Sequence, residues 1–117
     1  YEGNHIPSFI CTGNHDCNMI EKVSKNYISK EKIHSILFPK QTQTNQNYFY
    51  ADIPNPQGGT IRIISLDMLD QPGTEYNTRI YAYYSQEQIY WLGNIALIKG
   101  ITDKHSINIL NHYPFQA

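Results

Sequence analysis

The sequence of 117 residues predicts a single α/β domain in which helices pack on a β-sheet. Short apolar or alternating segments, typical of strands, fall at residues 8–12, 47–53, 61–66 and 106–110. Segments with helical apolar spacing lie between them, and polar or proline–glycine clusters separate the two kinds of segment. The predicted order is therefore strand, helices, hairpin, helix, strand.

The first predicted strand, residues 8–12, ends at Gly13 and is followed by Asn14, His15 and Asp16. A strand that stops at glycine can turn sharply and present the next side chains at its carboxyl end, where open α/β sheets bind ligands. Amide oxygens and imidazole nitrogens bind divalent metals, and a carboxylate beside a histidine orients the ring and favours its protonated form. These three residues are candidate site residues.

Two helices are expected next. Asn18 can cap a helix over residues 19–27, and Ser29 can cap a second helix that Pro39 ends. The inward face of the second helix is expected to hold Ile33, Ile36 and Leu37. Residues 40–46 are polar and without periodicity, which indicates a loop.

A β-hairpin follows. Residues 47–53 alternate in hydropathy, as a half-exposed strand does, and residues 61–66 form a nearly continuous apolar strand. The proline–glycine cluster at residues 54–59 predicts the turn between them. The second strand ends at Asp67, a further polar residue at the end of a strand.

The last helix and strand are also marked in the sequence. Ser85 and Gln88 form a capping box, with serine at the N-cap and glutamine three residues on. The helix is expected to run to about residue 98 and to end at Gly100, with Trp91 packing at an edge. Its inward residues are predicted to be Ile89, Leu92, Ile95 and Ala96, and the strand at 106–110 then delivers Asn111 and His112.

Composition excludes some functions and leaves others open. A net charge of −1 gives no reason for nucleic acid or an anionic membrane to be an obligatory partner. Cys11 and Cys17 are too few to form a disulfide framework, which favours a cytoplasmic location. No apolar run approaches the length of a membrane span.

The Gly-Asn-His-Asp motif at residues 13–16, together with a distant strand followed by Asn111-His112-Tyr113-Pro114, resembles the calcineurin-like metallophosphoesterases. The elements between the two motifs are similar in order to those of bacterial and phage-type members. The resemblance implies a four-layer αββα sandwich with helices flanking the β-sheet. It also implies two divalent metal ions roughly 3.5–4 Å apart that bind a phosphoester substrate.

The same resemblance implies a role for each motif residue. Asn14 and His112 match ligands of the second metal, which nitrogen and oxygen donors allow to be Mn, Fe, Zn, Co or Ni. His15 matches the general acid or charge stabiliser at the leaving oxygen, and Asp16 matches the carboxylate that orients it. Asp67 also ends a strand. Its carboxylate is expected either to join the site residues at the carboxyl ends of the strands or to serve as a helix-capping or turn carboxylate.

Several motifs of the family have no match here, namely its Asp-x-His, Gly-Asp-x-x-Asp and Gly-His-x-His sequences. Asp103-Lys104-His105 imitates the first, but it precedes a strand and lies on the wrong side of residues 13–16. We therefore expect residues 1–117 to be the middle portion of one phosphoesterase domain, inactive alone and weak in metal affinity. Unpaired sheet edges would then favour self-association. His34, like His105, is expected at the surface.

Two other interpretations remain open from the sequence. One is a non-catalytic binding or structural module on a phosphoesterase-like scaffold. The other is an enzyme with Cys17 as its nucleophile, which would be sensitive to thiol alkylation and indifferent to chelators.

Overall fold

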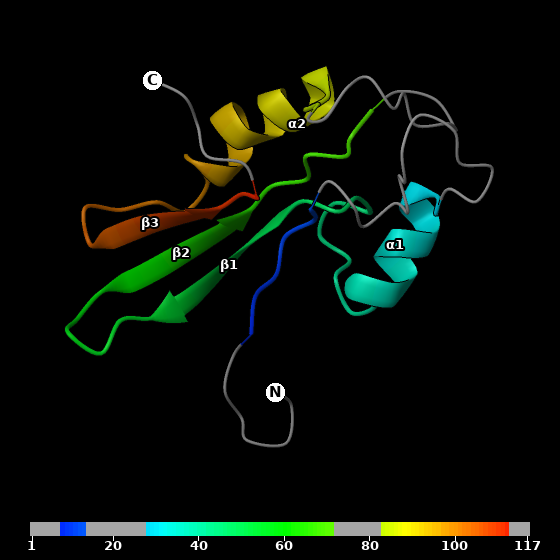
Figure 1. Ribbon diagram of the computed structural model, residues 1–117. Helices are drawn as coiled ribbons and strands as arrows, with labels where there is room; N and C mark the ends of the chain where they lie inside the picture. Colours follow the sequence, from blue (N-terminus) through cyan, green and yellow to red (C-terminus); the bar gives the residue numbers. More distant parts are fainter. Residues whose placement is uncertain (1–7, 14–27, 72–82, 113–117) are drawn as a thin grey trace.

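The computed structural model describes residues 8–13, 28–71 and 83–112, and the statements below concern those residues. Three strands form one sheet in the order β1-β2-β3, so the predicted mixed α/β class is confirmed (Figure 1). The helix expected at 19–27 lies outside the described residues. The elements in chain order are α1 (Lys30–Leu37), β1 (Phe49–Pro54), β2 (Thr60–Ser65), α2 (Gln86–Trp91), its π-helical continuation η2 (Leu92–Ala96) and β3 (His105–Leu110).

The predicted hairpin is confirmed, because β1 and β2 pair antiparallel. In its turn the Gly58 amide donates to the Asn55 carbonyl at 2.9 Å, and the Asn55 amide donates to the Gly59 carbonyl at 3.0 Å. Both glycines have φ in the left-handed region, 104° and 81°, which glycine adopts without steric cost. A Cβ on Gly59 would lie 2.3 Å from the Lys104 carbonyl oxygen, so the turn packs closely against the chain leading into β3.

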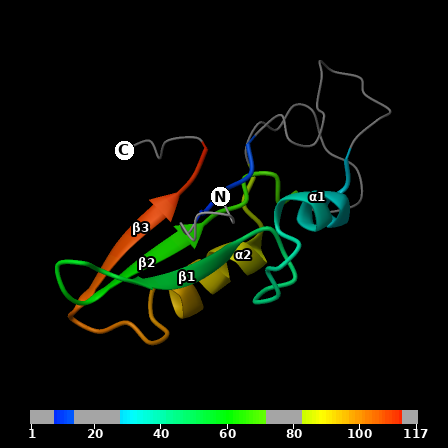
Figure 2. The same cartoon turned by 90° about the horizontal axis from the view of Figure 1, so that it is seen from below.

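β2 and β3 are parallel, an arrangement that requires a long crossover connection between them. That connection contains α2 and η2, which cover one face of the sheet (Figures 1 and 2). By contrast, α1 lies beyond the end of the sheet where β1 begins and β2 ends, rather than on a sheet face. Among the described elements, only α2 and η2 therefore pack on the sheet.

α1 begins as predicted, with the Ser29 hydroxyl accepting a hydrogen bond from the Lys32 amide at 3.2 Å. Ile33 is buried and packs with Met68 and Leu69, and Leu37 joins this cluster one turn later. Ile36, predicted to face inward, is instead 57% exposed. Residues four apart share a helix face, so the pair Ile33 and Leu37 defines the buried side of this short helix and turns Ile36 to solvent.

Three of the four inward residues predicted for the last helix, Leu92, Ile95 and Ala96, pack on the hydrophobic core, and the fourth does not. Ile89 is 56% exposed, whereas Trp91, expected at an edge, is 6% exposed and lies in the core. The buried side of α2 also includes the polar residue Gln88, which the apolar pattern did not indicate. A wider turn follows, in which the Leu97 amide donates to the Leu92 carbonyl at 3.0 Å, and it brings the predicted Ala96 to the interior.

The main core lies between the sheet and α2. The Tyr48 and Trp91 rings have centroids 4.8 Å apart in a tilted arrangement. Tilted and edge-on ring pairs of this kind add to the stabilisation that burial of their area provides. The buried members of this core are Tyr48, Ile64, Leu66, Trp91 and Ala96.

Arg62 interrupts the apolar strand and is nevertheless only 2% exposed. Its Nε and Nη2 donate to the two carboxylate oxygens of Asp52 at 2.8 and 2.9 Å, and its Nη1 donates to the Ala96 carbonyl at 2.9 Å. The guanidinium carbon lies 4.0 Å from the centre of the Tyr50 ring. These contacts compensate the charge and tie β1, β2 and η2 together.

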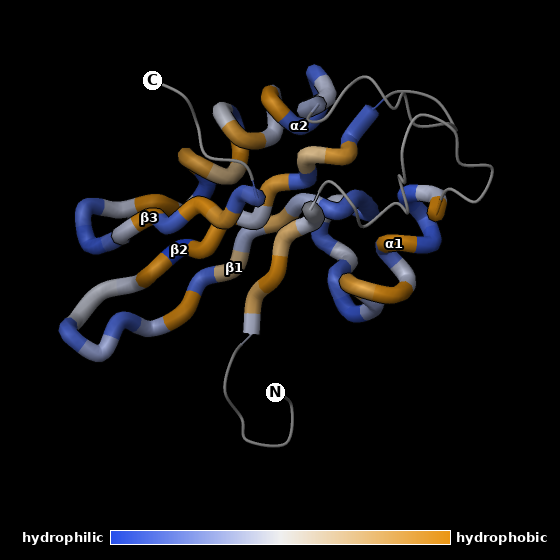
Figure 3. Tube along the Cα trace, in the orientation of Figure 1, coloured by the Kyte–Doolittle hydropathy of each residue, from blue (hydrophilic) through white to orange (hydrophobic). Residues whose placement is uncertain are grey.

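Figure 3 shows apolar residues along the strands and hydrophilic residues at the turns. Within the described part of the chain no strand pairs with the outer side of β3, where Ile107 and Ile109 are 38% and 40% exposed. Self-association through such an edge stays a prediction.

Candidate functional site

The carboxyl ends of β2 and β3 lie side by side, because the parallel register pairs Ser65 with Leu110. The Leu66 amide extends the pairing by donating to the Leu110 carbonyl at 3.0 Å. Asp67 follows the first of these strands and His112 follows the second. We call this region the carboxyl edge.

Residues 8–13 reach the same edge, although they are not a strand. The Ser65 hydroxyl donates to the Ile10 carbonyl at 2.6 Å, and the Thr12 hydroxyl donates to Asp67 Oδ1 at 2.7 Å. Both views place the segment beside the end of β2 (Figures 1 and 2). The strand predicted here is wrong, because no described strand pairs with the segment and side-chain hydroxyls attach it to the sheet.

Gly13 lies against the imidazole of His112. A Cβ built on this glycine would be 3.5 Å from Cγ and Nδ1 of the ring and 3.6 Å from Cδ2. The φ of Gly13 is outside the left-handed region, and the residues after it, on which the expected turn depends, lie outside the described part of the chain. At this separation a Cβ would be in ordinary van der Waals contact with the ring, so the Gly13 backbone packs beside His112. Two segments from opposite ends of the chain therefore meet at the carboxyl edge.

Asp67 is 1% exposed, and its role is decided by its contacts. Its Oδ1 accepts from the Thr12 hydroxyl and from the Leu69 amide, the latter at 3.0 Å. Burial raises the pKa of Asp67, while these two hydrogen bonds oppose the rise. The residue is thus a turn carboxylate that also holds the segment preceding the predicted motif.

Gln88 is a residue whose role the sequence did not reveal. Its Oε1 accepts from the Asp67 amide at 2.8 Å, and its Nε2 donates to the Asp67 carbonyl at 2.9 Å. The capping box is therefore only half formed. The Ser85 hydroxyl accepts from the Gln88 amide at 3.0 Å, but the glutamine side chain turns inward instead of returning to the amide of Ser85.

Asp70 joins three elements behind the carboxyl edge. Its Oδ1 accepts from Lys30 of α1 at 3.0 Å, and its Oδ2 accepts from the hydroxyl of Ser85 and, at 3.0 Å, from Gln88 Nε2. The carboxylate is 3% exposed. A buried carboxylate with a cation and several donors fixes the start of α1 relative to the start of α2.

Asn111 is held by Tyr84, the residue before the N-cap of α2, because the Tyr84 hydroxyl donates to Asn111 Oδ1 at 2.7 Å. Burial raises the pKa of Tyr84. This hydrogen bond fixes the residue immediately before His112. The sequence did not predict a contact between Tyr84 and Asn111.

The structure describes one of the four predicted site residues. His112 is exposed at the carboxyl edge, and Asn14, His15 and Asp16 lie outside the described residues. Within residues 8–13, 28–71 and 83–112, no three His, Cys, Asp or Glu side chains converge as a metal site would require. His112 can supply one imidazole nitrogen, and Asn14 can supply an amide oxygen by its chemistry.

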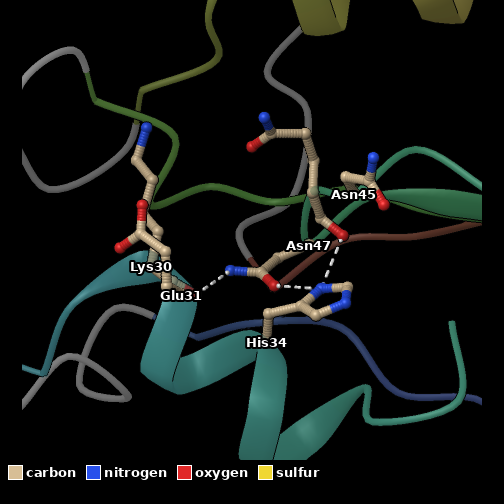
Figure 4. Close-up of a pocket in the computed structure, with 6 residues that line it drawn as sticks. Lys30, Glu31, His34, Asn45 and Asn47 are labelled. Carbon is tan, nitrogen blue, oxygen red and sulfur yellow. Dashed lines mark hydrogen bonds between the residues drawn. The ribbon is translucent and has the colours of Figure 1, made fainter. Parts of the chain in front are cut away.

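A small pocket of about 160 Å³ lies at α1 and the loop that follows it (Figure 4). His34, expected at the surface, is half-buried in its wall. Its Nδ1 lies 3.0 Å from the Gln46 carbonyl and 3.1 Å from Asn47 Oδ1, both acceptors, so Nδ1 carries a proton. All of its lining residues are of polar or charged types, and none of them belongs to the carboxyl edge. Its lining residues are Lys30, Glu31, His34, Asn45, Gln46 and Asn47.

His105, at the opposite end of β3 from His112, belongs to a turn. Its Nδ1 accepts from the Thr102 amide at 3.0 Å.

Comparison of the chain with protein-family models, with curated proteins and with solved structures finds no match. The described helices are too short and too polar for any of them to cross a bilayer.

Proposed function

We propose that this chain is part of a metal-dependent phosphoesterase of the calcineurin-like family. In this proposal the three-stranded sheet belongs to a four-layer αββα sandwich. Asn14, His15, Asp16 and His112 contribute to one site at the carboxyl edge.

One observation carries the proposal, the position of Gly13 beside the His112 ring, where a Cβ built on the glycine would lie 3.5 Å from the ring. The residue that immediately precedes Asn14-His15-Asp16 thereby lies against the other histidine that the resemblance assigns to the site. A peptide unit spans 3.8 Å between Cα atoms, so Asn14 starts within one such step of that contact. A phosphoesterase site of this kind needs both segments at one edge.

The proposed roles follow from the chemistry of each side chain. Asn14 and His112 would be metal ligands, and the bound metals would neutralise negative charge that develops on the phosphate. His15 would donate a proton to the leaving oxygen or stabilise its charge, since its pKa lies near neutrality. Asp16 would orient the His15 ring by accepting from its other nitrogen.

Asn14 and His112 alone do not complete a two-metal site, because each metal needs four or more donors. The proposal therefore requires further donors, of the Asp-x-His, Gly-Asp-x-x-Asp and Gly-His-x-His type, in the protein that contains this chain. Reading the encoding frame on both sides of residues 1–117 is the first check. Absence of all three motifs would favour a non-catalytic module on this scaffold.

The decisive experiment measures hydrolysis of chromogenic phosphomonoesters and phosphodiesters by the protein that carries these motifs. We expect activity to disappear on chelation and to return with added Mn, Fe, Zn, Co or Ni. His15→Ala should lower kcat by about 10²–10⁴, the contribution of a general acid, with metal content unchanged. His105→Ala is the matched control at the other end of β3 and should keep full activity.

His112→Ala should instead lower metal content along with activity. Activity that survives chelation but is lost on thiol alkylation would replace the proposal with a Cys17 nucleophile. Metal binding without hydrolysis of any ester would favour the binding module.

A further inference from the structure

The last side chain before Asn14 belongs to Thr12, because residue 13 is glycine. Thr12 is fully buried, with 0% exposure, and its hydroxyl donates to Asp67 Oδ1. This hydrogen bond is therefore the final side-chain attachment of the segment before the predicted motif begins.

Asp67 is itself held in place at three points. Its backbone amide and carbonyl both bond to the side-chain amide of Gln88, at 2.8 and 2.9 Å, and its Oδ1 accepts from the Leu69 amide. Gln88 in turn lies on α2, which packs on the sheet. The carboxylate oxygen that Thr12 meets is thus fixed relative to β2 and α2.

The consequence of this attachment appears one residue later. Gly13 follows Thr12 directly and lies against the His112 ring, which follows β3. Residues 8–13 are not part of a strand, and the Ser65–Ile10 and Thr12–Asp67 hydrogen bonds attach the segment at the end of β2. The Thr12–Asp67 hydrogen bond lies one residue before that contact.

We infer that Asp67 is a positioning residue, which holds Thr12 so that the Gly13 backbone, immediately before the motif, contacts the His112 ring. Its relevance to catalysis rests on the proposed function, whereas the positioning itself concerns described residues only. A carboxylate that orients the surroundings of a site in this way changes affinity or activity by about 10- to 100-fold when it is lost.

Conservative pairs of variants test the inference. Thr12→Val removes the hydroxyl while keeping the side-chain shape, and Thr12→Ser keeps the hydroxyl. Asp67→Ala removes the acceptor, and Asp67→Asn keeps an oxygen that can accept from both Thr12 and Leu69. Ser65→Ala is the matched control, because it removes the other buried hydroxyl bond to the same segment, at Ile10.

The first readout is the nuclear Overhauser effect between the Gly13 α-protons and the His112 ring, measured on the 117-residue chain. We expect it to weaken at least threefold in Thr12→Val and Asp67→Ala and to persist in Thr12→Ser, Asp67→Asn and Ser65→Ala. An unchanged signal in Thr12→Val and Asp67→Ala would overturn the inference. An equal loss in Ser65→Ala would also overturn it, because general loosening of the segment would then explain the result.

The second readout is kcat in the protein that carries the missing metal motifs. We expect Thr12→Val and Asp67→Ala each to lower kcat about 10- to 100-fold. The double variant should lose little more than either single one, since both act through one bond. Fully additive losses would overturn the inference. If the wild type hydrolyses no phosphoester, the proposed function fails. The nuclear Overhauser effect between Gly13 and His112 then still tests the positioning role of Asp67.

Discussion

At the amino end of β2, Arg62 meets Asp52 in a two-point ion pair, whereas at the carboxyl end Asp67 is buried with only neutral donors on the oxygen that is bonded. The two carboxyl groups respond oppositely. The hydrogen bonds to Arg62 lower the pKa of Asp52, and burial raises the pKa of Asp67. The ionised form is favoured by the fold at one end of the strand and disfavoured at the other.

The two carboxyl groups therefore have different roles: Asp52 stabilises the sheet, and Asp67 positions a neighbouring segment. The ion pair joins β1 to β2 and stabilises the sheet. Burial of Asp67 has an unfavourable desolvation cost, but its carboxylate attaches the segment that reaches His112. Polar groups that are costly to bury and that organise a neighbouring contact are typical of functional regions, which agrees with the proposed site at the carboxyl edge.

The largest expected effect comes from Gln88→Glu. A formed capping box would accept glutamate at this position, since it is the common residue there. In the structure Nε2 of Gln88 donates to the Asp67 carbonyl and to Asp70, so a glutamate would lose both bonds and bury a second negative charge. We expect the free energy of unfolding in urea to fall by about 3–5 kcal/mol. Gln86→Glu, two residues earlier and exposed, should change it by less than about 0.5 kcal/mol. Equal values for the two variants would contradict the inward position of Gln88.

An intermediate effect is expected at the other end of β2, from Asp52→Asn. The variant breaks a charge-assisted pair to the buried Arg62, but Asp52 is 38% exposed, so solvent screens part of the loss. We expect a loss of about 1–2 kcal/mol at pH 7, measured by urea unfolding. The stability that Asp52 contributes is present above its unfolded pKa of about 3.9 and is lost as pH falls through its lowered folded pKa. The variant should therefore not show this decrease in the free energy of unfolding at acid pH. Asp103→Asn, in an exposed turn, serves as control and should show neither change.

The smallest effect is expected from Asp67→Asn, because the side chain keeps its shape and its accepting oxygen. Between the unfolded pKa of about 3.9 and the raised folded pKa, the folded protein binds more protons, so the free energy of unfolding falls as pH rises through this window. The variant should abolish that fall and differ from wild type by less than about 1 kcal/mol below pH 4. Urea unfolding at several pH values between 4 and 8 measures both. The comparison between Asp52 and Asp67 would be contradicted if the wild-type free energy of unfolding rose with pH in this window and Asp67→Asn abolished that rise.

Local signals in the sequence were sufficient for most of the elements. The proline–glycine turn between β1 and β2, the Ser29 and Ser85 caps and the glycine after η2 were all recognisable, because each depends on residues within a few positions of one another. The placement of Asp67 and His112 at adjacent strand ends also followed from the order of elements.

Other features depended on partners far away in the chain. The apolar pattern of α2 could not show that Gln88 faces inward, because its partners Asp67 and Asp70 belong to another segment. The pattern at residues 8–12 predicted a strand, although pairing requires a neighbour that the pattern does not contain. The sequence could predict that the segments of Gly13 and His112 lie at the same edge of the sheet, but not that these two residues are in contact.

The sequence by itself determined the α/β class, the turns and caps, and the residues available for chemistry, since these follow from local conformational preference and side-chain type. Tertiary structure decided which helix faces are buried, how residues 8–13 are attached, and which ring Gly13 touches. Those outcomes depend on packing and hydrogen bonds between segments distant in sequence, and local preference carries no information about them.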